Sequence, residues 1–147
     1  MAATAEPRLS MEALGAALLT TARELVERNG GVYPFGGHST GGLDDPDLVT
    51  PTGEGAFPLA DRLHAEVVAQ LAAAVEAGAV VTAVCTDVVI RPPGEDRTDA
   101  LRVLVEHPQS HPLALYLPYR RERDGYRFGE LIATPGDPLV RASGPAA

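Results

Sequence analysis

The stretch from Ala79 to Thr134 constrains the fold most strongly, because much of it alternates with the period of a β-strand. Turn-like segments at residues 92–98, 107–112 and 120–125 divide it into four predicted strands, joined as an antiparallel meander. The first strand is largely apolar on both faces, which predicts a central strand with cover on both sides or a dimer contact on one. In the last strand, Gly129 is a candidate bulge.

Two amphipathic helices are predicted before this meander. Residues 11–28 and 59–77 each carry apolar side chains at helical spacing, and each set forms one stripe that faces a core. Ser10 is expected to cap the first helix, and Pro58 suits the first turn of the second. The glycines that follow the two stretches favour helix termination.

Two short strands, Val32–Phe35 and Leu48–Pro51, are expected between the helices. The predicted fold class is therefore α+β in the order α-β-β-α-β-β-β-β, with two helices packed on one face of a curved antiparallel sheet. Residues 10–134 are expected to form a single domain. Residues 1–9 are expected to be a flexible N-terminus, and residues 135–147 a C-terminal tail that contains proline and glycine.

The chain has a net charge of −8, and this charge is unevenly distributed. Residues 91–127 contain seven arginines and six acidic residues, whereas the rest of the chain contains five arginines and fourteen acidic residues. The acidic balance argues against general binding to nucleic acid or to an anionic membrane, because both need positive charge at the contact. It favours a small acidic protein that remains in solution.

All twelve basic residues are arginine, and alanine is frequent. This composition is typical of GC-rich bacterial genomes, and arginine selected for bidentate anion binding is the alternative. No secretory signal pattern and no run of about 18 apolar residues is visible, so a cytoplasmic location is expected.

The Gly-rich loop Gly36–Gly42 is the first candidate binding site, and it contains His38, Ser39 and Thr40. Glycine lets backbone amides converge on an anion, and hydroxyl groups add donors. The phosphate loop of nucleotide hydrolases is excluded because there is no Gly-Lys-Ser/Thr ending, and the spacing of a Gly-x-Ser-x-Gly nucleophile is absent too. The loop is interpreted as a connection or, alternatively, as a ligand- or partner-binding loop.

Asp87 is the second candidate, because a carboxylate on a central strand needs a partner. A hairpin turn centred near residue 95 would place Arg102 opposite Asp87, which predicts a structural ion pair or, alternatively, a polar anchor in a ligand pocket. Tyr116, on the third predicted strand, is a further candidate polar group of such a pocket. Cys85 is expected to be a buried, inert thiol, and as the single cysteine it excludes an internal disulfide.

Two groups of residues have metal-ligand character. The histidines of residues 107–111 have the spacing of a helical zinc site, but the prolines in the same segment rule out a helix. The acidic segment 44–47 lacks the calcium-loop pattern, and together with His38 it is the one group that could form a mixed oxygen and nitrogen site. The sequence predicts no metal and no cofactor.

Three functions are compatible with these features. The first is a non-enzymatic binding or accessory protein that acts through its sheet face as a homodimer, with apolar residues in need of cover at Val81, Ala83, Val89, Leu104, Ala114 and Tyr116. The second is an enzyme or carrier whose pocket lies between the sheet and loop 36–42, with polar groups at His38, Asp87, Arg102 and Tyr116. The third is an immunity- or antitoxin-like protein that covers a basic protein.

Overall fold

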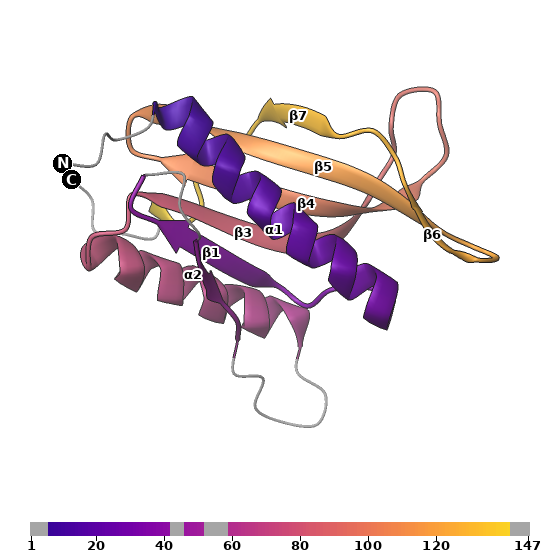
Figure 1. Cartoon of the computed structure of the whole chain (residues 1–147), viewed down its shortest axis with the longest axis horizontal. Coiled ribbons are helices and arrows are strands. Elements are labelled where there is room, and N and C mark those ends of the chain that lie inside the picture. The colour runs from indigo at the N-terminus through magenta and orange to yellow at the C-terminus, as the bar shows by residue number, and fades with distance from the viewer. Residues whose placement is uncertain (1–5, 42–45, 52–58, 142–147) are drawn as a thin grey trace.

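The computed structural model describes residues 6–41, 46–51 and 59–141, and these contain two helices and seven strands (Figure 1). In chain order the elements are α1 (Pro7–Asn29), β1 (Phe35–Ser39), β2 (Asp47–Val49), α2 (Ala60–Glu76), β3 (Val81–Ile90), β4 (Thr98–His107), β5 (Ser110–Glu122), β6 (Gly125–Phe128) and β7 (Ile132–Pro135). The predicted α+β class, the antiparallel sheet and the order of the first eight elements are confirmed.

All strand pairs are antiparallel, and the strands follow the order β2-β1-β3-β4-β5-β6, with β7 paired to β5. Since β4 occupies one side of β5, β6 and β7 share the other side and form one interrupted edge. Along this edge, Phe128 and Ile132 are four residues apart. Their respective partners on β5, Tyr119 and Tyr116, are only three residues apart. One extra residue is therefore inserted between them, as the candidate bulge at Gly129 predicts.

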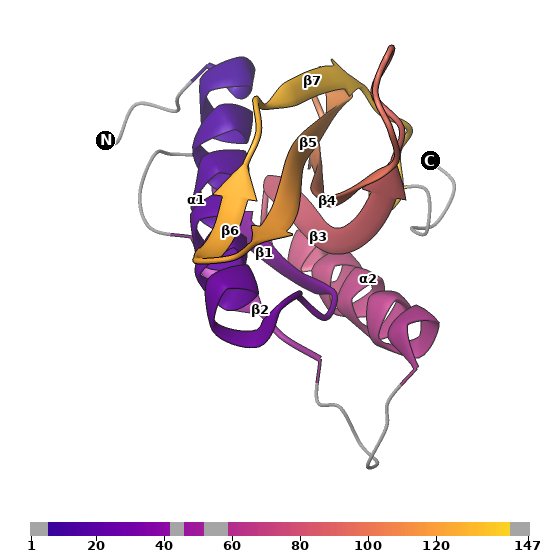
Figure 2. The same cartoon turned by 90° about the vertical axis from the view of Figure 1, so that its right-hand side faces the viewer.

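The two helices lie on opposite faces of the sheet, which differs from the predicted packing on one face. Neighbouring residues of a strand point to opposite faces. A Cβ atom added to Gly36 of β1 would lie 2.9 Å from Leu71 of α2, whereas a Cβ atom added to Gly37 would lie 2.8 Å from Leu18 of α1. Figure 2 shows the same arrangement, with the sheet between α1 and α2. An amphipathic stripe shows that a helix buries one side, but it carries no information about which face of the sheet that side covers.

Each face of the sheet has its own apolar core. The larger core packs under α1 and includes Leu14, Leu18, Ala83, Cys85, Leu101 and Val103. The smaller core packs under α2 and consists of Val49, Val67, Val68, Leu71, Val84 and Val140. The apolar character of β3 on both faces follows from this arrangement, because β3 contributes to both cores.

Residues 36–39, predicted as part of a Gly-rich loop, form strand β1 between β2 and β3. Glycine occupies these positions because both helices approach the backbone closely, and a Cβ atom at Gly36 would also lie 2.9 Å from the Ala83 carbonyl oxygen. Of the strand predicted at Val32–Phe35, only Phe35 belongs to β1. Gly42 lies outside the described residues.

Helix α1 begins at Pro7, upstream of Ser10, the predicted N-cap. Proline suits the first helical position because the N–H group that it lacks would have no partner there. Ser10 is only 1% exposed, and its hydroxyl donates to the Pro7 carbonyl oxygen at 3.1 Å. Residues 1–5 of the predicted flexible N-terminus lie outside the described residues.

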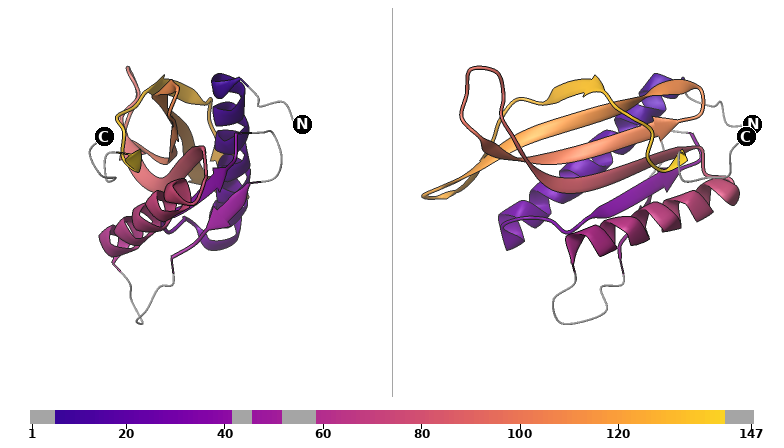
Figure 3. Two further views of the ribbon diagram at one scale, coloured as in Figure 1. Left: turned by 90° about the vertical axis from the view of Figure 1, so that its left-hand side faces the viewer. Right: turned by 180° about the vertical axis from the view of Figure 1, so that it is seen from behind.

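Part of the predicted tail packs on the sheet, since residues 136–141 run along the face that α2 also covers (Figure 3). The carboxylate of Glu106, a residue 1% exposed, accepts hydrogen bonds from the backbone N–H groups of Leu139, Val140 and Arg141 at 3.1, 2.7 and 3.2 Å. A buried carboxylate needs such donors. Glu106 therefore anchors the segment that follows β7, and residues 142–147 lie outside the described residues.

Gly36→Ala is expected to lower the free energy of unfolding by about 1–3 kcal/mol, because the new methyl group would overlap the Ala83 carbonyl oxygen. Gly129→Ala is the matched control, since its Cβ atom would lie at an ordinary 3.4 Å from Pro118, and its effect should stay within about 0.5 kcal/mol. Urea unfolding measures both variants. Equal stability of Gly36→Ala and the wild-type chain would contradict the close helix packing.

Glu106→Ala is expected to cost about 2 kcal/mol or more, because it removes the carboxylate that accepts from the N–H groups of residues 139–141, of which the Val140 bond is buried. Hydrogen exchange should accelerate at these three amides first. Glu130→Ala, at an exposed position, is the control and should leave both measurements unchanged. Unaltered protection of the three amides in Glu106→Ala would show that the carboxylate is not the anchor.

Candidate functional site

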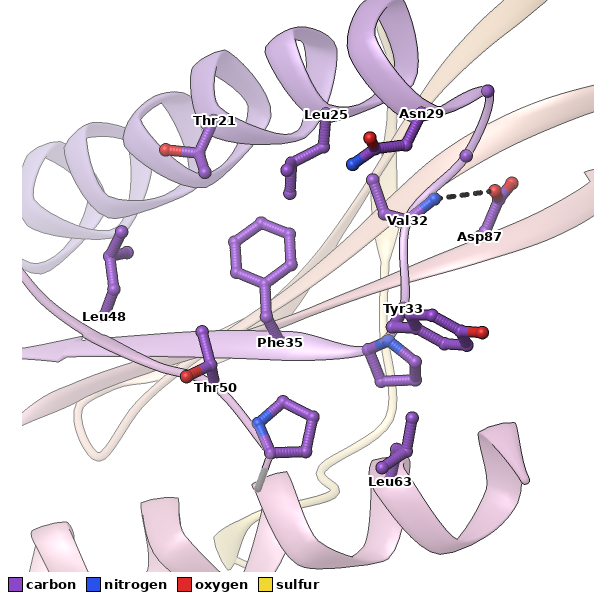
Figure 4. Close-up of a pocket in the computed structure, with 14 residues that line it drawn as sticks. Thr21, Leu25, Asn29, Val32, Tyr33, Phe35, Leu48, Thr50, Leu63 and Asp87 are labelled. Atoms are coloured by element: carbon purple, nitrogen blue, oxygen red, sulfur yellow. Dashed lines mark hydrogen bonds between the residues drawn. The ribbon is translucent and has the colours of Figure 1, made fainter. Parts of the chain in front are cut away.

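A pocket of about 860 Å³ lies where the C-terminal half of α1, the connection to β1, β2 and α2 meet (Figure 4). Its apolar wall includes Leu25, Val32, Tyr33, Phe35, Leu48 and Leu63. Polar groups at its surface come from Thr21, Asn29 and Thr50. Among the described residues of the lining, Asp87 of β3 contributes the one charged side chain.

The local sequence explains why this pocket is open. Gly30 ends α1 in the left-handed conformation, with φ of 85°, and turns the chain away from the helix axis. The connection then crosses to β1 with Tyr33 64% exposed, and across the pocket Leu48 of the edge strand β2 is 49% exposed. Large apolar side chains that stay exposed beside a hollow are typical of binding surfaces.

Asp87 is held at the rim of this pocket by two hydrogen-bond donors. The Tyr119 hydroxyl donates to the carboxylate, 2.7 Å from Oδ1 and 2.8 Å from Oδ2. The Val32 N–H group donates to Oδ2 at 3.2 Å (Figure 4). A Cβ atom at Gly31 would lie 2.8 Å from Oδ2, so a larger residue there would displace the Asp87 carboxylate.

Loss of hydration raises the pKa of Asp87 above its ordinary value. The Tyr119 and Val32 donors stabilise the carboxylate and oppose this shift, while the negative charge of Asp99 adds to it. The residue is exposed as a whole, yet both carboxylate oxygens are in contact with protein donors. Asp87 is therefore an easily accessible carboxyl group that holds its proton more strongly than a solvated aspartate.

Two neighbours of Asp87 are also shifted. Burial, followed by the hydrogen bond to Asp87, raises the pKa of Tyr119, so its hydroxyl stays protonated and donates. Burial, followed by the Asp87 charge, raises the pKa of Cys85. The thiol is buried and protonated, which agrees with the inert role predicted for it.

The predicted ion pair between Asp87 and Arg102 is wrong. Asp87 lies opposite Leu101, and Arg102 lies opposite Thr86. The true register differs by one residue from the predicted one, and a slip of one residue moves a side chain to the other face. Tyr119, on the same face as Asp87, is the partner that the sequence did not identify. With the correct register, the alternation of side chains along β5 would have identified Tyr119 as the partner of Asp87.

Arg102 and Tyr116 do lie together, on the face opposite Asp87. They are direct cross-strand partners, and Arg102 Nε donates to the Tyr116 hydroxyl at 3.1 Å. The guanidinium carbon is also 5.9 Å from the centre of the Tyr116 ring. This pair forms a separate polar patch and does not contribute to the Asp87 pocket.

The remaining predicted residues, His38, Ser39 and Thr40, lie at the other end of β1. His38 Nδ1 is 4.0 Å from an Asp47 carboxylate oxygen, and Ser39 Oγ accepts from the Gly41 N–H group at 3.4 Å. Residues 44 and 45 lie outside the described residues, and within the described ones no group of three or more His, Cys, Asp or Glu side chains could hold a metal ion. The six predicted residues therefore occupy three separate places.

The sheet face predicted to need cover is not a single face. Val81 and Ala83 are 0% exposed under α1, whereas Leu104 and Ala114, both 2% exposed, belong to the other face. Val89 is the one exposed member of that group, at 55%. The monomer therefore covers most of the residues on which the predicted dimer depended, and the dimer itself stays a prediction.

Comparison with protein-family models, with curated proteins and with solved structures found no match to this chain. Among the described residues, neither helix is long and apolar enough to cross a membrane.

The carboxyl group of Asp87 should titrate above its ordinary pKa of about 3.9 in a carbon-13 NMR titration. Tyr119→Phe should raise the value further, because it removes a donor that stabilises the carboxylate. A midpoint at or below the ordinary value would contradict the proposed hydration loss.

The same shift predicts the pH dependence of stability. A native pKa above the unfolded one means that the folded chain binds the proton more tightly. The stabilisation from Asp87 is therefore fully present below about pH 4 and is lost as the pH rises through the native value. Urea unfolding of the wild type and Asp87→Asn between pH 3 and 7 should show this difference.

Proposed function

We propose that this protein is a non-enzymatic binding protein that holds a ligand with an apolar body and one ammonium group in the Asp87 pocket. The observation that carries the proposal is the combination of an apolar wall with one carboxylate whose position is set by Tyr119 and Val32. A small amine therefore finds both apolar contact and a fixed counter-charge in one site.

The size and lining of the pocket support this proposal. Sites for small ligands commonly have volumes of about 300–1,000 Å³, with mostly apolar walls and a few placed polar groups. The pocket has about 860 Å³, an apolar wall and Asp87 at its rim. The aromatic rings of Tyr33 and Phe35 provide flat contact area, and an ammonium group also interacts favourably with an aromatic face.

Electrostatics favours a cationic ligand. The Asp87 carboxylate accepts bonds from two protein donors and retains lone pairs for a third. The chain as a whole carries a charge of −8, which attracts cations to its surface. Binding of an ammonium group would favour the ionised form of Asp87 and lower its raised pKa, so ligand affinity and Asp87 ionisation are coupled.

The composition of the pocket favours binding over catalysis. Among the described residues of its lining, Tyr33 and Asp87 are the ionisable ones, and the single thiol of the chain, Cys85, is buried and protonated. Nucleophilic catalysis requires an activated nucleophile next to a base, and this lining offers no such pair. A basic side chain from a partner protein is a second possible occupant, in keeping with the acidic charge of the chain. Binding of a free small amine would favour a small ligand over this partner protein.

The proposal is tested by NMR titration of the labelled full chain with 2-phenylethylamine and with 2-phenylethanol, its neutral counterpart. The amine should bind more tightly and perturb the amides of residues 29–32, 48 and 87. Asp87→Asn should remove most of the preference for the amine. Leu48→Ser should weaken both compounds about fivefold, because it removes apolar contact.

Leu131→Ser is the matched control, because Leu131 is 50% exposed, like Leu48, but lies outside the pocket lining. It should leave both affinities unchanged. Equal binding of amine and alcohol to the wild-type chain would refute the charge-based part of the proposal. Loss of binding in Leu131→Ser to the same degree as in Leu48→Ser would refute the location.

A further inference from the structure

Three arginines line one hollow at the end of the sheet where β4 begins and β5 ends. Arg97 precedes β4, and Arg120 and Arg121 lie near the end of β5. These side chains, with Thr98, Asp99 and Tyr119, line a small hollow of about 290 Å³. The hollow is separate from the proposed amine pocket, since the two share no described lining residue.

The strand register brings the arginines together. Asp99 of β4 lies opposite Tyr119 of β5. Because the two strands are antiparallel, Arg97, two residues before Asp99, and Arg121, two residues after Tyr119, come from neighbouring segments, and both line the hollow. Arg120 alternates with Tyr119 and Arg121 along β5, and it lines both this hollow and a neighbouring one that includes Arg127.

The charge of the hollow is unbalanced. Three arginines and one aspartate line it, so its side chains carry a net charge of +2 in a chain whose total is −8. The ion pairs recorded among the described residues do not include Arg97, Arg120 or Arg121, whereas the neighbouring Arg127 pairs with Glu122 at 3.2 Å. Like charges held close together repel, and a bound anion would relieve this repulsion.

The hydroxyl groups of Thr98 and Tyr119 in the hollow are already engaged. The Thr98 hydroxyl is 3.1 Å from the Asp99 carbonyl oxygen and 3.2 Å from the Tyr119 carbonyl oxygen, and the Tyr119 hydroxyl donates to Asp87. The guanidinium groups are therefore the donors that can recognise a ligand in this hollow. Their planar N–H donors suit bidentate binding of an oxyanion.

We propose that this hollow, formed by Arg97, Arg120 and Arg121, binds the phosphoryl group of a small phosphomonoester. A phosphomonoester carries a charge of about −1.5 to −2 at pH 7, which matches the +2 of the lining. The hollow has room for one such group, and the body of the ligand lies outside it. A long nucleic acid is disfavoured because residues outside 91–127 carry a net charge of −9.

The test is an NMR titration of the labelled full chain with phenyl phosphate at pH 7.5 and low ionic strength. The proposal expects saturable shifts at the amides of residues 98, 99 and 119–121, together with weaker binding as salt is added. Acetate, which carries one charge, should bind at least about tenfold more weakly. Absence of saturable shifts with phenyl phosphate would overturn the proposal.

Matched variants locate the site. Arg121→Gln should weaken phenyl phosphate about tenfold, and Arg97→Gln should have a similar effect. Arg123→Gln removes the same charge from the adjacent exposed turn, outside the hollow, and should stay within about twofold of wild type. Equal losses in Arg121→Gln and Arg123→Gln would show general electrostatic attraction and refute the site.

A further comparison distinguishes a small phosphomonoester from a nucleic acid as the ligand. A single-stranded oligonucleotide without a terminal phosphate should bind no more tightly than phenyl phosphate, and tighter binding would overturn the choice of a small ligand. Failure of phosphate binding leaves the amine pocket untouched, since none of these three arginines lines it. Circular dichroism should confirm that each variant keeps the wild-type fold.

Discussion

The packing of two helices against opposite sides of β1 is the constraint on which the rest of the structure depends. Gly36 and Gly37 have no side chains, so α2 and α1 each approach the backbone from their own side. This contact divides the interior into two cores and makes β3, the neighbour of β1, apolar on both faces. It also sets the position of the connection between α1 and β1, and that connection forms one wall of the Asp87 pocket.

Asp87 and Tyr119 link this architecture to the chemistry of the surface. The tyrosine reaches from β5 across β4 to a carboxylate on β3, so one hydrogen bond spans three strands of the sheet. Its hydroxyl faces the pocket carboxylate, while the same residue also lines the arginine hollow. Tyr119 thus contacts the carboxylate of the apolar pocket and also lines the positively charged hollow.

The periodic parts of the chain were predictable, and the contacts between them were not. Both helices and the strands of the meander follow from apolar spacing, because burial of one side of each element is a local requirement. Gly36 and Gly37 were interpreted as loop residues, since a sequence does not reveal that another helix needs their space. Asp87 was assigned to Arg102 because turn position alone leaves the strand register uncertain by one residue, and that residue decides the face.

The sequence by itself determined the kinds of element, their order, the antiparallel connection of the meander and the acidic charge, because each depends on neighbouring residues or on composition. Only the tertiary structure decided which face each helix covers, which partner Asp87 has, and that residues 136–141 belong to the packed domain. These features depend on side chains that are far apart in the chain, such as Asp87 and Tyr119 or Glu106 and Val140. Their pairing follows from strand register and burial, which are properties of the whole sheet.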